Sequence, residues 1–247
     1  MFGTLFSVVF IQPTLNLLMG LAFLIPGHDL GLAIIGLTIL VKLALYPLTK
    51  QQIKQQRAMQ AIQPKIEEIR ARLKDNKEAQ AKELMELYAT EKVNPAASCL
   101  PLLIQLPVLI GLYRALSLGL HEQAVGLLYG FVPAVTVSTH LLGVVDLSKP
   151  SYVLAVLAAV VQFFQTRQIM QPPAATIAPP PQEVQGTDGA KDESMASMMN
   201  KQMMYMMPIM TVVIGISLPA GLTLYWFLMS VLTVLQQMHT LKKPAQV

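Results

Sequence analysis

The sequence is short of the residues that catalytic, metal and nucleotide sites need. It contains one cysteine, Cys99, so no internal disulfide can form. Its histidines are scattered, and none falls in a spacing typical of zinc ligands: His28, His121, His140 and His239. Neither a GxGxxG fingerprint nor a P-loop is present, which leaves nucleotide-driven chemistry unsupported. We therefore expect a protein that is not an enzyme and that uses no cofactor and no metal.

Charged residues are also scarce. They make up 13% of the chain, whereas hydrophobic residues make up 53% and the mean hydropathy is +0.51. Soluble domains carry about 25% charged residues. Long apolar runs account for the difference, so the sequence predicts a multi-pass membrane protein. The first Lys or Arg is Lys42, and the start of the chain therefore has the features of neither a signal peptide nor a transit peptide. This favours the plasma membrane of a bacterium over an organelle.

Five apolar segments predict five transmembrane helices, and together they indicate an all-α polytopic membrane protein. The segments are residues 28–49, 95–119, 151–170, 203–218 and 222–240. Ten Lys and Arg residues lie between Thr49 and Asn94, whereas the loop 120–150 has only Lys149. The positive-inside rule then places the N-terminus outside and the tail, residues 241–247, in the cytoplasm.

The remaining segments are predicted from their polar interruptions and composition. Residues 1–27 contain Gln12, Pro13 and Asn16 within an apolar run, which favours an amphipathic helix in the outer membrane interface. Within the outer loop, 120–150, the stretch 124–137 is too short to span comfortably and is also predicted to be interfacial. If this stretch crossed the membrane, the predicted orientation of every later span would be inverted.

Two further connections complete the predicted topology. Residues 171–202 begin with a stretch rich in Pro, Ala and Gly and are predicted to be a disordered cytoplasmic linker. Residues 219–221, Pro-Ala-Gly, are predicted to form a tight outer turn between the last two spans.

The charged segment 50–94 predicts a cytoplasmic hairpin of two helices. Its first arm has apolar residues at helical spacing, and the pattern breaks near Asp75. Pro64 suits the first turn of that arm. The predicted hairpin residues are Pro64, Ile66, Arg70, Arg72 and Asp75. Two interpretations stay open: a solvated connector between spans, which the charge pattern alone slightly favours, or a device that meets a cytosolic partner.

Lys42 is the one charge in residues 31–48, the apolar stretch of the first span, and lies about 10 Å inside the membrane boundary at helical rise. A cation at the centre of a spanning helix costs about 2.5–3.5 kcal/mol on insertion scales. Asp and Glu are absent from the five predicted spans when the first is counted from residue 30 to residue 48, so an ion pair within the chain is not expected. Lys42 would then be free to attract an anionic group supplied by another molecule.

Other polar residues of the spans could converge on Lys42 and form a wet pocket open to the cytosol. They are Thr38, Gln105, Gln162, Gln165, Ser230 and Thr233. Two function classes fit such a pocket: a transporter or channel for an anionic solute, and a protein that receives polypeptide segments and passes them into lipid. The sequence shows no internal repeat, which mildly disfavours a transporter.

Four blocks of sequence carry a resemblance to a known family. They are TILVKLALYPLT (38–49), QPKIEEIRARL (63–73), ELYATEKVNPAASCLPLLIQLPVLIGLY (86–113) and LPAGLTLYWFLMSVLTVLQQ (218–237). From about residue 12 to 240 the chain resembles the YidC/Oxa/Alb family of membrane protein insertases. The resemblance implies five core helices, a cytoplasmic helical hairpin and a hydrophilic groove open to cytosol and lipid. It also implies that the basic residue of the first span, usually arginine and here Lys42, attracts polar or acidic parts of a nascent chain.

The resemblance also implies partners and a path for the substrate. Nascent membrane proteins and the lipid bilayer are the expected partners, the Sec translocon and the ribosome are further candidates, and no sequence-specific nucleic acid is expected. Thr38 matches a position lining the substrate path, and a hydrophobic slide on the third and fifth spans would involve Tyr225, Trp226, Phe163 and Phe164. We expect no large outer domain and, with only Lys242 and Lys243 in the tail, weak tail-mediated ribosome binding.

Overall fold

The computed structural model describes residues 2–94, 100–119, 126–170 and 195–242, and nearly all of its regular structure is helical. The helices are α1 (Phe2–Phe6), η1 (Ser7–Ile11), α2 (Gln12–Leu24), η2 (Pro26–His28), α3 (Leu30–Ala44), α4 (Tyr46–Ala61), α5 (Gln63–Arg72), α6 (Lys77–Thr90), α7 (Leu100–Gly119), α8 (Tyr152–Met170), α9 (Met195–Gly215) and α10 (Ala220–Lys242). Two short strands, β1 (His140–Leu141) and β2 (Val145–Asp146), pair antiparallel. The chain is an all-α polytopic membrane protein with one small β-ribbon outside its bundle.

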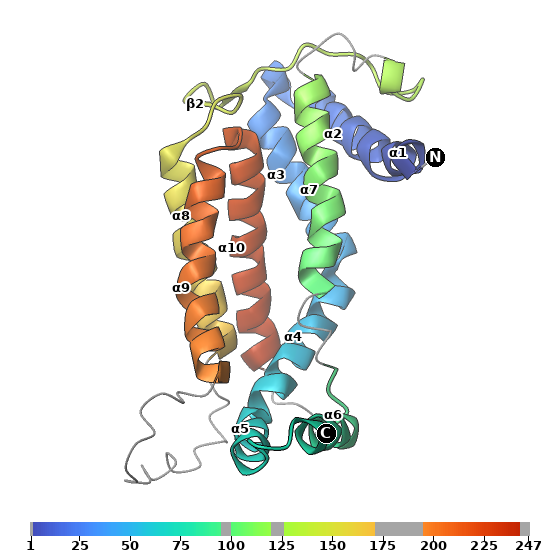
Figure 1. Ribbon diagram of the computed structural model, residues 1–247. Helices are drawn as coiled ribbons and strands as arrows, with labels where there is room; N and C mark the ends of the chain where they lie inside the picture. Colours follow the sequence, from blue (N-terminus) through green and yellow to red (C-terminus); the bar gives the residue numbers. More distant parts are fainter. Residues whose placement is uncertain (1, 95–99, 120–125, 171–194, 243–247) are drawn as a thin grey trace.

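The long helices α3, α7, α8, α9 and α10 stand side by side and alternate in direction (Figure 1). α10 lies centrally and packs against α3 and α8, and α8 packs against α9. The hairpin α5–α6 lies at one end of the bundle, called here the hairpin end. Residues 126–150 cover the opposite end, called here the loop end.

Several helices are long and apolar enough to cross a bilayer. They are Thr4–Leu24, Tyr152–Met170 and Ala220–Thr240, and α3 with α4 forms a fourth candidate that is bent by 65°. Large apolar side chains such as Leu43, Val153 and Ile209 lie exposed on the outside of the bundle. Such residues suit a bilayer, because lipid replaces the water that would disfavour their exposure.

The main apolar core lies in the loop half of the bundle. It joins the face of α2 that carries Leu15 and Leu18 to the first half of α3, where Ile34 is buried. The start of α10 adds Tyr225, and the last turns of α7 add Leu112. All four elements reach this end of the bundle, so it is the most densely packed part of the molecule.

The first predicted span ends earlier than its apolar run suggests. α3 stops at Ala44, and the chain turns through 65° before α4 begins at Tyr46. Pro47 sits in the first turn of α4, where its missing N–H costs no helical hydrogen bond. Residues 46–49, which the sequence analysis placed in the span or at its border, therefore belong to the helix that leads to the hairpin.

The hairpin has the two arms that its sequence pattern predicts. Pro64 lies in the first turn of α5, and Asn76 caps α6 by accepting a hydrogen bond from the N–H of Ala79 at 3.0 Å. Ile62 and Ile66 are buried against the second arm.

Polar contacts also join the arms of the hairpin. Glu83 pairs with Arg72, Lys65 Nζ lies 2.5 Å from Glu91 Oε1, and the carbonyl of Arg70 accepts from Gln80. Asp75 lies exposed in the turn between the arms.

The N-terminal helix lies across the loop end, inclined to the bundle (Figure 1). Its polar interruption is satisfied within the protein, because the buried Asn16 amide donates to the carbonyl of Leu127 at 3.0 Å and accepts from the N–H of Tyr129 at 2.6 Å. The preceding π-helical turn, η1, ends at the residue before Gln12 and Pro13. This helix is long enough to span, so its placement in the interface stays a prediction.

The outer loop is held by the start of α3. Asp29 caps that helix by accepting from the N–H of Leu32 at 3.0 Å, and its second oxygen accepts from the N–H of Leu142 at 2.6 Å. The N–H of Leu30 donates to the carbonyl of Ser138 at 3.0 Å. Residues 126–137 have an irregular backbone, which cannot satisfy its polar groups when exposed to lipid, so they do not form a spanning helix.

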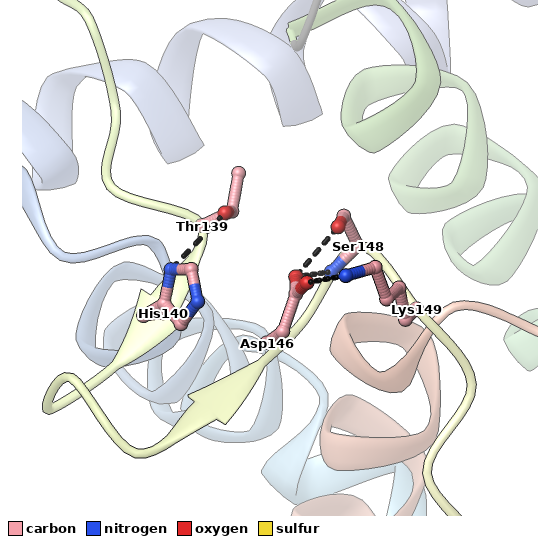
Figure 2. Close-up of polar contacts among 5 residues, drawn as sticks. All are labelled: Thr139, His140, Asp146, Ser148 and Lys149. Carbon is pink, nitrogen blue, oxygen red and sulfur yellow. Dashed lines mark hydrogen bonds and ion pairs between the residues drawn. The ribbon is translucent and has the colours of Figure 1, made fainter.

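Figure 2 shows how the β-ribbon of this loop ends. Asp146 Oδ1 accepts from the hydroxyl and the N–H of Ser148 at 2.6 and 3.0 Å, and its Oδ2 lies 3.1 Å from Lys149 Nζ. These contacts, of which that with the Ser148 hydroxyl has the largest effect, lower the pKa of Asp146 from 3.8 to about 2. On the other strand, the ring of His140 lies 3.5 Å from the hydroxyl of Thr139.

Two boundaries near the last spans differ from the sequence predictions. α9 begins at Met195, so residues 195–202 are helical and do not belong to a disordered linker. This polar start is rich in Met, Ala, Lys and Gln, which favour helix without being apolar enough to signal a span. The turn occupies residues 216–219, and Ala220 and Gly221 already belong to α10.

Three of the sequence predictions concern residues outside the described ranges. They are residues 171–194 of the predicted linker, Cys99 and His121.

We predict that Asp29 stabilises the outer loop. Asp29→Ala removes both acceptors and should lower the free energy of unfolding by about 1–3 kcal/mol, because the N–H groups of Leu32 and Leu142 both lose the hydrogen bond that the carboxylate accepts. Asp29→Asn keeps one acceptor, so its free energy of unfolding should lie between those of the wild type and Asp29→Ala. Thermal unfolding in detergent, followed by the fluorescence of the single tryptophan Trp226, measures the order of stability of the three proteins. Equal stability of the three proteins would contradict this role.

Candidate functional site

Lys42 is buried in the seam between α3 and α10. Its side chain is 6% exposed, and Nζ donates a hydrogen bond to Thr233 Oγ1 at 2.8 Å. The Thr233 hydroxyl in turn donates to the carbonyl of Met229 at 2.6 Å. None of the ion pairs among the described residues involves Lys42. The ammonium therefore has a neutral partner and no counter-charge from the described chain.

Further polar side chains line the same seam. Thr38, one turn before Lys42, is fully buried, and its hydroxyl donates to the carbonyl of Ile34 at 2.6 Å. Ser230 is buried on α10, three residues before Thr233 and on the same face of the helix. The structure thus joins two of the predicted groove residues directly, Lys42 and Thr233, and helical spacing places Thr38 and Ser230 on the same faces of α3 and α10. We call the surface formed by these four residues the seam.

The predicted glutamines lie at other interfaces. Gln162 on α8 accepts a hydrogen bond from the hydroxyl of Thr211 on α9, a buried residue that the sequence analysis did not single out. Gln105 on α7 donates from Nε2 to the hydroxyl of Tyr225 on α10 at 3.0 Å. Gln165 is half-buried on α8. These amides tie neighbouring helices together, so they are not gathered around Lys42.

The aromatic residues expected on a hydrophobic slide divide into two groups. Phe164 is 50% exposed, and its neighbour Phe163 contacts both Phe164 and Tyr205 with ring centroids about 6 Å apart. Trp226 is half-buried. Tyr225, in contrast, is fully buried in the main core, so its ring offers no surface along which a segment could slide.

A cleft opens between α8 and α10 beside Phe164. Its volume is about 370 Å³, and its walls are formed by Val161, Phe164, Gln168, Val231, Val234 and Leu235. Nearly all of this lining is apolar, and it continues the lipid-facing surface of α8. An apolar side chain or acyl chain would therefore find a matching environment there.

Two buried glutamines of α10 were missed by the sequence reasoning. Gln236 donates from Nε2 to the carbonyl of Tyr46 at 3.0 Å, next to the bend between α3 and α4. Gln237 is fully buried, one turn beyond Thr233. A signal was available, because Ser230, Thr233 and Gln237 recur at i, i+3 and i+7 on an otherwise apolar helix. Within the described ranges, no group of three or more His, Cys, Asp or Glu side chains could hold a metal ion.

Comparisons with known proteins give consistent matches. The sequence model of the family described as 60Kd inner membrane protein matches residues 22–246. A membrane protein insertase YidC from Fusobacterium nucleatum subsp. nucleatum is 35% identical over 231 residues, which cover 91% of this chain and 95% of the relative. Another, from Geobacter metallireducens, is 32% identical over 220 residues, which cover 88% of this chain but only 34% of the relative. The chain thus spans about a third of the length of one relative and nearly all of the other.

A solved structure is similar as well. The crystal structure of an active YidC insertase matches with a TM-score of 0.51 and 27% sequence identity. The match covers 83% of this chain and 40% of that one. The long helices described above therefore have counterparts in an experimentally determined fold.

We predict that Lys42 lowers the stability of the protein. Lys42→Met removes a desolvated charge and the one hydrogen bond that the ammonium donates to Thr233, and the Thr233 hydroxyl keeps its bond to Met229. The free energy of unfolding should rise by about 1 kcal/mol or more. Thermal unfolding in detergent measures the change, and Lys50→Met, at an exposed position of α4, is the matched control. A lower melting temperature for Lys42→Met than for that control would contradict the prediction.

Proposed function

Because this chain belongs to the 60Kd inner membrane protein family, the YidC/Oxa/Alb group of multi-pass inner membrane proteins, we propose that it is a membrane protein insertase. One observation carries the proposal. Lys42, in the first long helix of the bundle, is a buried cation. Among the described residues, its one hydrogen-bond partner is the uncharged hydroxyl of Thr233, and no Asp or Glu forms an ion pair with it. Such a group attracts a polar or acidic segment that another polypeptide supplies.

We place the hairpin end in the cytoplasm and the loop end outside. The support is the excess of Lys and Arg in α4–α6 over the loop 126–150, where Lys149 is the only such residue. Nascent membrane proteins would then approach Lys42 from the hairpin side. The Sec translocon and the ribosome, if they take part, would be met on the sides facing lipid and cytosol.

The first proposed step is entry of the polar flank of a nascent segment. Lys42 gives up Thr233 and binds an acidic or polar group of the flank. This exchange is favourable for an acidic flank because a carboxylate both accepts a hydrogen bond and neutralises the buried ammonium, whereas the Thr233 hydroxyl only accepts a hydrogen bond. The Thr233 hydroxyl stays satisfied by Met229, so little is lost on the protein side.

The second step is transfer of the apolar part of the segment into lipid. The cleft between α8 and α10, with Phe164 in its wall, offers an apolar surface next to the polar seam. Burial of apolar surface from water drives the segment along it. Water that fills part of the polar seam would shorten the low-dielectric barrier that the flank must cross. The membrane potential would in addition favour the crossing of acidic flanks. The proposed path uses no nucleotide, metal or covalent chemistry.

We predict that insertion of acidic flanks depends on the charge of residue 42. The protein is reconstituted in sealed liposomes, and single-span substrates with acidic or neutral N-terminal flanks are synthesised alongside. Lys42→Ala should lower protease protection of the acidic flank about 10-fold or more, because a charge-assisted hydrogen bond is lost. Lys42→Glu should lower it further through repulsion, and Lys42→Arg should preserve it.

Controls separate this mechanism from its alternatives. Lys50→Ala removes an exposed positive charge of α4 and should leave insertion unchanged. Wild-type protection by Lys42→Glu would retain an insertase but reject the charge mechanism. If wild-type liposomes protect no flank yet take up a small anion, the protein is a transporter for anionic solutes and the proposed function is wrong.

A further inference from the structure

Polar residues of α10 form a stripe that continues from the Lys42 seam toward the hairpin end. Ser230, Thr233, Gln237 and Thr240 follow at intervals of three, four and three residues, which keeps them on one face of the helix. Gln237 lies one turn, about 6 Å, to the hairpin side of the Thr233 hydroxyl that holds Lys42. A segment that moves from the hairpin end to Lys42 along this face passes Gln237 first.

Gln237 is the exceptional member of this stripe. Its side chain is completely buried, yet neither Oε1 nor Nε2 has a hydrogen-bond partner among the described residues. Buried polar atoms almost always have partners, because leaving one unmatched costs about as much as the lost hydrogen bond. The adjacent Gln236 differs, since its Nε2 is bound to the carbonyl of Tyr46.

Nearby polar atoms at the hairpin end share this condition. Gln236 Oε1 and Thr240 Oγ1 on α10, and Gln168 Oε1 across the cleft on α8, are buried without a partner among the described residues. The unmatched atoms include both acceptors and donors. A ligand that satisfies them must therefore offer hydrogen-bond donors and acceptors together.

A polypeptide main chain offers both kinds of group at every residue. The carboxamide of Gln237 can accept from a peptide N–H and donate to a peptide carbonyl. A carboxylate alone would use only the Nε2 donors and leave Oε1 unmatched. Gln237 has no hydrogen bond to any described residue that must break before it binds, so displacement of the side chains that cover it is the main cost.

We propose that the Gln237 carboxamide binds the main-chain amides of the entering polar flank, one turn before the flank reaches Lys42. The inference rests on the proposed insertase function and adds to it a site that recognises the backbone independently of side-chain charge. Lys42 then selects flanks by charge, whereas Gln237 serves acidic and neutral flanks alike.

The test combines a variant of the protein with a change in the substrate backbone. A single-span substrate with a neutral flank is made by cell-free synthesis, with α-hydroxy acids replacing single flank residues so that one amide becomes an ester and loses its N–H. Insertion into liposomes containing the full chain is scored by the initial rate of protease protection. With wild type, an ester at one or two flank positions should lower this rate about 2- to 10-fold.

Gln237→Leu should lower the rate for the all-amide flank by a similar factor, and the ester should then have no further effect. Such non-additivity reports a direct interaction between the two groups, which a merely structural role of Gln237 would not produce. Gln162→Leu is the matched control: it removes a carboxamide of α8 that is bound to Thr211, and the ester effect should remain complete. Gln237→Asn, which keeps a carboxamide, should retain part of the effect and guards against misfolding of the leucine variant.

The outcomes separate this inference from the proposed function. If wild type inserts the flank but the ester lowers the rate equally in wild type and Gln237→Leu, the carboxamide does not bind the backbone and only this inference is wrong. The same holds if Gln237→Leu inserts all-amide flanks at the wild-type rate. If wild type protects no more flank than empty liposomes do, the proposed insertase function is wrong, and the proposed backbone-binding site is wrong as well.

Discussion

The bundle is organised around a buried positive charge that forms no ion pair with any described residue. Lys42 sits in the seam between α3 and α10, and its ammonium has only the Thr233 hydroxyl as a described partner. A desolvated cation is unfavourable in a bilayer, so the neighbouring positions must be polar, as Thr38 and Ser230 are. This requirement explains a polar face on an otherwise apolar α10. It also predicts that the seam adds less to stability than an apolar contact of the same size.

The two ends of the bundle differ in how far their buried polar side chains are hydrogen-bonded. At the loop end, Asp29 and Asn16 are each bound to two or more backbone groups, and the loop 126–150 closes over the helices. At the hairpin end, Gln168 and Gln237 keep polar atoms unmatched within the described chain. A satisfied network is rigid and closed, whereas unmatched atoms favour an incoming partner. This difference supports the proposed entry of a substrate from the hairpin end.

Much of this architecture could be predicted from sequence, and the failures have a common physical cause. Apolar runs, the position of Pro64 and the break near Asp75 were enough to indicate the helices of the bundle and the two arms of the hairpin. Partners of buried side chains could not be predicted, because a helix that is apolar on nearly every face gives no signal of its rotation. Gln162 thus pairs with Thr211, and Tyr225 enters the core. The bend after Ala44 was missed because apolarity continues through Leu48.

The distribution of the core explains how one bundle can be both stable and receptive. Its main apolar cluster lies in the loop half, from Leu15 of α2 through Ile34 of α3 to Tyr225 of α10. The hairpin half of α10 instead presents Thr233, Gln236 and Gln237. Local stability follows buried apolar contacts, so the loop half should open last and the hairpin half first. An insertase needs this gradient, because the seam must admit a polypeptide at one end while the other end keeps the membrane sealed.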